Sequence, residues 1–62
     1  MITKYTPNKN LARQWARKWT ADQIKQKLAG LERNAKNAPT TEQQNGFLNL
    51  VETAHLALKL KA

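Results

Sequence analysis

The 62-residue sequence predicts an all-α protein, a small three-helix bundle. In three stretches the apolar residues recur every three or four positions, which is the spacing of one face of a helix. Residues that commonly cap helices mark where these stretches begin, and a proline stands at the start of the first stretch and after the end of the second. No stretch of useful length alternates apolar and polar residues as a half-buried strand would. We therefore expect one domain over residues 1–62, with an extended N-terminus at residues 1–6.

The first helix is expected over residues 7–19. Pro7 suits a first helical position, where its missing N–H is not needed, and Thr6 would then be the N-cap, with Asn8 and Asn10 as alternatives. The apolar side chains of this stretch fall on one arc of the helix: Leu11, Ala12, Trp15, Ala16 and Trp19. The two tryptophans are expected to pack in the core, and base stacking or contact with a membrane surface are the alternatives.

The second helix is expected over residues 20–37. Thr20 and Gln23 have the spacing of a capping box, in which each side chain accepts a hydrogen bond from the backbone N–H of the other residue. The apolar seam of the helix then follows at Ile24, Leu28, Leu31, Ala35 and Ala38. Pro39 ends the helix because proline disfavours helical geometry at the residue before it. A helix-turn-helix with its turn at Gly30 is an alternative, but the unbroken seam favours one continuous helix.

The third helix is expected over residues 41–60. Its start is marked by a second capping box, formed by Thr40 with Gln43 or by Thr41 with Gln44. Its main apolar stripe consists of Phe47, Leu50, Val51, Ala54, Ala57 and Leu58. The short connection before it predicts that the second and third helices form an antiparallel hairpin, with the amphipathic first helix packed across it.

The distribution of charge indicates an anionic partner. Eleven Lys and Arg oppose four Asp and Glu, giving a net charge of +7, and the whole excess lies in residues 1–36. We expect the cations of the first two helices to gather on one flank and to bind nucleic acid or an acidic protein surface, although such residues can also simply form a solvated face. The candidate residues are Lys9, Arg13, Arg17, Lys18, Lys25, Arg33 and Lys36.

Three leucines of the third helix lie off its main apolar stripe: Leu48, Leu56 and Leu60. A helix that is apolar around most of its circumference is usually buried on more than one side. These leucines are therefore candidates for a protein interface, either in a homodimer through the third helix or with another protein.

Several kinds of chemistry are not expected. Without cysteine and with His55 as the single histidine, the chain offers neither disulfides nor a zinc site. The carboxylates Asp22, Glu32, Glu42 and Glu52 lie on different turns, so no catalytic pair is visible. We expect no cofactor, metal or enzymatic activity. Because no apolar run resembles a signal sequence or a membrane span, we expect a soluble cytoplasmic protein. A membrane surface is not the expected partner, because the first helix is short and the capping boxes favour a folded bundle that buries the tryptophans.

Two functions remain as hypotheses. The first is a non-catalytic protein that binds the nucleic-acid backbone through the basic faces of the first two helices. The second is a regulator or inhibitor that docks on a larger host enzyme or nucleic-acid-binding complex. No family motif is recognised, although in size, charge and helicity the chain resembles the small regulatory proteins of phages and mobile elements in a general way.

Overall fold

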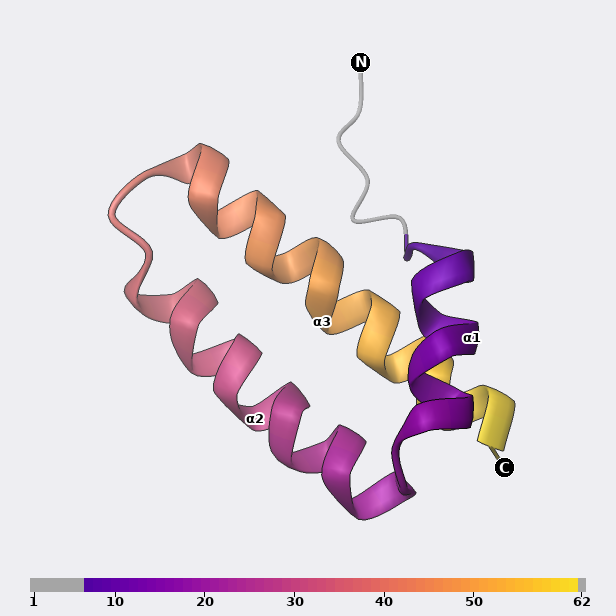
Figure 1. The fold of residues 1–62 in the computed structure, drawn as a ribbon. Coiled ribbons are helices and arrows are strands. Elements are labelled where there is room, and N and C mark those ends of the chain that lie inside the picture. Colours follow the sequence, from indigo (N-terminus) through magenta and orange to yellow (C-terminus); the bar gives the residue numbers. More distant parts are fainter. Residues whose placement is uncertain (1–6, 62) are drawn as a thin grey trace.

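The computed structural model describes residues 7–61, and three helices make up nearly all of this range (Figure 1). They are α1 (Lys9–Lys18), α2 (Ala21–Asn37) and α3 (Thr41–Lys61). α2 and α3 form an antiparallel hairpin with the most extensive contact, and α1 packs mainly against α3. The predicted fold class is therefore confirmed. The extended conformation expected for residues 1–6 falls outside the described residues.

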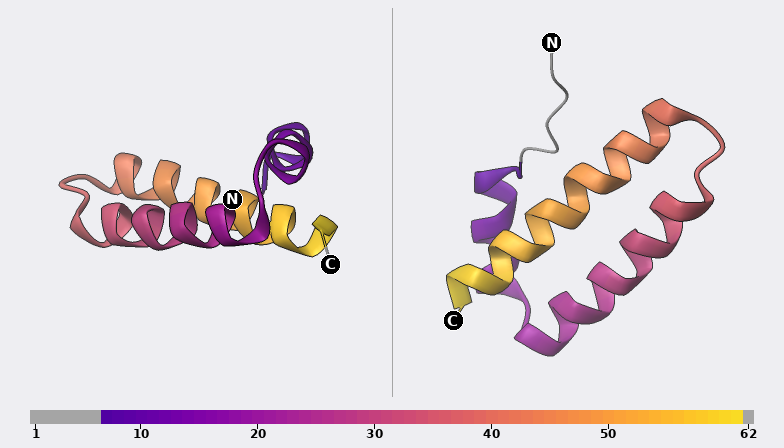
Figure 2. Two further views of the ribbon diagram at one scale, coloured as in Figure 1. Left: turned by 60° about the horizontal axis from the view of Figure 1, so that its bottom comes forward. Right: turned by 180° about the vertical axis from the view of Figure 1, so that it is seen from behind.

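The molecule has one complete layer and one partial layer. In the left view of Figure 2 the α2–α3 hairpin forms the lower layer, and α1 stands on one face of it, at the end where α2 begins and α3 finishes. The other end of that face, toward the loop between α2 and α3, is not covered by α1. No helix within residues 7–61 is both long enough and apolar enough to cross a membrane.

The boundaries of α1 differ from the prediction at both ends. Asn8, one of the alternative caps, accepts a hydrogen bond from the Leu11 N–H through its side-chain oxygen (3.0 Å), so the helix begins at Lys9 and Pro7 precedes it. An asparagine at this position satisfies an N–H that the helix leaves free. At the other end Trp19 is extended, although its N–H still donates to the Trp15 carbonyl (2.9 Å).

The capping box that starts α2 is present in both directions. The Thr20 N–H donates to Gln23 Oε1 (2.9 Å), and the Gln23 N–H donates to Thr20 Oγ1 (3.2 Å). α2 then continues without interruption through Gly30 to Asn37. The helix-turn-helix alternative is therefore wrong, because its turn would have to break the helix at Gly30.

The first of the two capping residues considered for α3 is the one used. The Gln43 N–H donates to Thr40 Oγ1 (3.1 Å). The side chain of Gln44 instead donates to the Ala35 carbonyl (3.1 Å), which ties the first turns of α3 to the last turns of α2. This cross-link supports the antiparallel pairing of the two helices beside their short loop.

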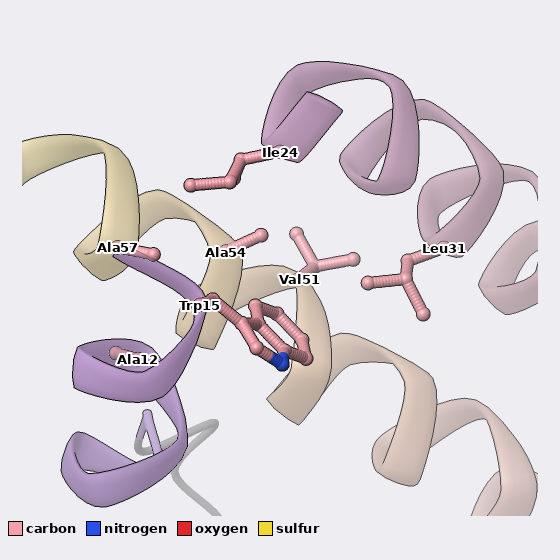
Figure 3. Close-up of a cluster of buried hydrophobic side chains, with 7 residues drawn as sticks. All are labelled: Ala12, Trp15, Ile24, Leu31, Val51, Ala54 and Ala57. Carbon is pink, nitrogen blue, oxygen red and sulfur yellow. The ribbon is translucent and has the colours of Figure 1, made fainter. Parts of the chain in front are cut away.

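The core lies where the three helices meet, and Figure 3 shows its buried apolar side chains. They are Ala12 and Trp15 from α1, Ile24 and Leu31 from α2, and Val51, Ala54 and Ala57 from α3. Two alanines on α3 leave room for α1 and α2 to approach it closely. Trp15 is 6% exposed, which confirms its predicted place in the core, while Trp19 is half-buried and packs against the same cluster.

Candidate anion-binding surface

The exposed side of α1 carries an unbroken line of cations. Lys9, Arg13 and Arg17 are all exposed and lie four residues apart, so each sits about one turn beyond the last, over about 12 Å of helix. Ala12 and Trp15, which are buried against α3, lie on the opposite side of the same helix. We call Lys9, Arg13 and Arg17 the α1 strip. Within residues 7–61 no acidic side chain forms an ion pair with it.

The predicted residue Lys18 is separated from the strip by its contact with an aromatic ring. Its ammonium nitrogen lies 5.7 Å from the centroid of the Trp19 ring. Lys27 of α2 lies over both tryptophans, 5.6 Å from the Trp15 centroid and 5.2 Å from the Trp19 centroid. Such distances allow cation–π attraction. The two rings are themselves 5.4 Å apart, so Lys18 and Lys27 help to fix a paired aromatic cluster.

The cations predicted on α2 form a separate surface. Because Lys27 contacts the tryptophans, it marks the side of α2 that faces α1. Lys25, Arg33 and Lys36 are exposed and, at about 100° per residue, lie roughly 120° to 180° around the helix from Lys27. They therefore point away from α1. The structure therefore divides the predicted set between two sides of the molecule, with the α1 strip on one of them.

The C-terminus of α3 adds residues to the α1 strip. Lys61 Nζ donates to the Ala16 carbonyl (2.8 Å), which brings a fourth cation to the last turns of α1. Leu60, 51% exposed, lines a shallow hollow of about 300 Å³ together with Ala16, Arg13 and Arg17. Lys61 was not among the candidate residues, because the two segments are 45 residues apart in sequence and meet only when α3 packs on α1.

The three leucines predicted as an interface do not line one common hollow. Leu60 lies beside the α1 strip, whereas Leu56 packs against the core and lines a different, small hollow of about 160 Å³ with Pro7, Glu52, His55 and Lys59. Leu48 is half-buried and lines neither hollow. Leu56 and Leu60 are one turn apart on α3, so an interface through these leucines stays a prediction.

The described residues offer little that resembles a catalytic or metal centre. Asp22, Glu32, Glu42 and Glu52 are all exposed on separate turns. His55 is exposed as well, and its imidazole forms no hydrogen bond within the described range. No three His, Cys, Asp or Glu residues between positions 7 and 61 lie close enough to hold a metal ion.

Comparisons with known proteins identify no relative of this chain. No protein-family model matches it, and neither a search of curated proteins nor a search of solved structures finds a match. The function must therefore be inferred from the surface of the molecule itself.

Proposed function

We propose that this is a non-catalytic binding protein that contacts the phosphate backbone of nucleic acid through Lys9, Arg13 and Arg17. The observation that carries the proposal is the α1 strip: exposed cations on successive turns, with no acidic partner in the described range, in a chain of net charge +7. A guanidinium group binds phosphate oxygens through two parallel N–H donors, which favours arginine at such a surface. Lys61 lies beside the last turns of α1, where it adds a fourth positive charge to the strip.

The cations of α2 have a different part in this proposal. Lys25, Arg33 and Lys36 point away from α1, so they do not reach a phosphate backbone that lies along the α1 strip. They raise the positive potential of the whole molecule and so increase the rate of encounter with a polyanion. This attraction is screened beyond about 8 Å at physiological ionic strength, so it contributes little to the bound complex.

The salt dependence of binding tests the proposal quantitatively. Four cations on duplex DNA would neutralise about four phosphates, which predicts a slope of about −3.6 for log K against log[salt]. The measurement is fluorescence anisotropy of a labelled short duplex, titrated with the full chain between about 50 mM and about 200 mM salt. A flat salt response would rule out backbone binding.

A pair of double variants tests where the contact lies. Arg13→Glu/Arg17→Glu and Lys25→Glu/Lys36→Glu change the net charge by the same amount, on opposite sides of the protein. The α1 variant is expected to lose more than about 100-fold in affinity, because each lost charge-assisted contact costs about 1.5–3 kcal/mol. The α2 variant is expected to lose less than about tenfold. Equal losses would show that net charge alone matters and would contradict the placement on α1, provided that circular dichroism shows both variants to be folded.

A second candidate function is supported by the hollow beside Leu60. A phosphate backbone would leave this apolar surface uncovered, whereas an acidic protein segment could place an apolar side chain on Leu60 and its carboxylates on Arg13 and Arg17. The chain would then act as a regulator or inhibitor of a larger protein. In nuclease-treated lysate, stoichiometric capture of a protein that is lost with Leu60→Gln, while duplex binding is unchanged, would favour this candidate.

A further inference from the structure

One side of α3 is covered by α1 over only part of its length. Residues that alternate four and three apart lie on this side: Gly46, Leu50, Thr53, Ala57 and Leu60. Thr53 and Ala57 are fully buried, and the Asn8 N–H at the start of α1 donates to Thr53 Oγ1 (3.0 Å). α1 is about 15 Å long and α3 about 31 Å, so one cannot cover the other. Gly46 and Leu50 lie on the part of α3 that precedes the contact with Asn8.

The uncovered part of this side forms an apolar hollow. Its volume is about 430 Å³, larger than the hollow beside Leu60, and Gln43, Gly46, Phe47 and Leu50 line it. Phe47 and Leu50 contact the core but are only partly buried. The hollow continues the same helix-packing side of α3 that α1 occupies farther along, so its geometry suits another helix.

Gly46 has no steric explanation within a single chain. A Cβ atom at this position would meet nothing within 4 Å, although glycine weakens a helix relative to almost any other residue. A glycine on a helix surface does, however, let the backbone of another helix approach closely. Gly30 is equally unobstructed but does not line this hollow, so it offers a matched control position.

We propose that a second copy of this chain occupies the hollow, with the two α3 helices crossing at Gly46. The four lining residues carry no charge, and none of the lysines and arginines between positions 7 and 61 lines this hollow. Two copies can therefore meet here without opposing their cations, and an anionic partner would gain nothing from this face. In a two-fold dimer the same patch lies on both sides, so Phe47 and Leu50 pack against their counterparts in the second copy.

The size of the patch sets the expected strength of this dimer. A standard interface removes about 800 Å² from each partner, roughly a sixth of the 4551 Å² that one chain exposes. Four lining residues supply only part of that area, so contacts must extend along the uncovered part of the hairpin. The dimer is accordingly expected to be weak and to depend on protein concentration.

The proposal is tested first on the unaltered full chain, without nucleic acid, so that its outcome is independent of the proposed function. Light scattering between about 10 µM and about 500 µM should show the mass rising from 7.1 kDa toward twice that value. Because Gly30 and Gly46 are the only glycines, their amide signals can be followed in NMR spectra during dilution. The Gly46 signal should shift with concentration, and the Gly30 signal should stay in place.

Two matched variants locate the contact. Gly46→Gln should remain monomeric at the highest concentration without loss of thermal stability as a monomer, because glutamine favours helix more than glycine does. Gly30→Gln, the same change on α2, should dimerise like the unaltered chain. A wild-type chain that stays monomeric throughout would overturn the proposal and leave the hollow to a different partner. A Gly46→Gln variant that still dimerises would overturn it too, since the dimer would then use another surface.

Discussion

Replacing Thr53 by valine tests the contact that fixes the start of α1 on α3. Thr53 is the one buried polar residue in the range 7–61, and its hydroxyl group has two partners. Oγ1 accepts from the Asn8 N–H (3.0 Å) and donates to the Asn49 carbonyl (2.9 Å). Valine has nearly the same shape, so the substitution removes the hydroxyl group without opening a cavity.

The expected loss of stability follows from the two hydrogen bonds. Leaving a buried N–H without an acceptor costs about 1–3 kcal/mol, and the lower end applies because Asn8 itself is exposed. The bond from Thr53 to the carbonyl four residues earlier contributes little, since such bonds slightly weaken a helix. We therefore expect a loss of about 1 kcal/mol, which lowers the melting temperature of a domain of this size by about 4–8 °C.

Thr53→Ser is the matched control, because it keeps the hydroxyl group and loses only a buried methyl group. That methyl group is worth about 0.8 kcal/mol, so the melting temperatures of the two variants will be similar. Hydrogen exchange separates them: the Asn8 amide should exchange faster in Thr53→Val and should stay protected in Thr53→Ser. An unchanged Asn8 amide and an unchanged melting temperature in Thr53→Val would refute the reasoning.

The remaining predictions concern the packing of α2. Ile24→Ala should lower the free energy of unfolding in urea by about 2–5 kcal/mol, because Ile24 is fully buried. Lys25→Ala, on the exposed side of α2, should change it by less than about 0.5 kcal/mol. Similar losses in the two variants would place Ile24 outside the core. Thr20→Ala should cost about 1 kcal/mol by removing a cap, measured by thermal denaturation, and an unchanged melting temperature would mean that the capping box does not stabilise α2. Lys27→Gln should lower the free energy of unfolding by about 1 kcal/mol and shift the tryptophan fluorescence emission, because the Lys27 ammonium group lies over both rings. Lys25→Gln should leave the emission unchanged.

Local signals explain why the helices could be predicted. The capping residues Thr20 and Thr40, and the proline that follows α2, act within three or four residues of themselves, so they can be read without knowledge of the fold. Local signals do not define the start of α1, because any of Thr6, Asn8 and Asn10 could cap it. Asn8 is used in the structure, and its backbone N–H bonds to Thr53, 45 residues away, a contact that local sequence does not reveal.

The amino-acid order alone therefore defined the helices, the side of each that is apolar and the excess of positive charge. It could not define which outer sides lie next to one another, because that depends on how each helix is rotated when it packs. Lys27 faces the tryptophans of α1 while Lys25, two residues earlier, points away from them, and Leu60 and Lys61 meet α1 across 45 residues of chain. Packing of Trp15, Ile24 and Ala57 in a shared core sets these rotations, and it thereby separates the α1 strip from the cations of α2.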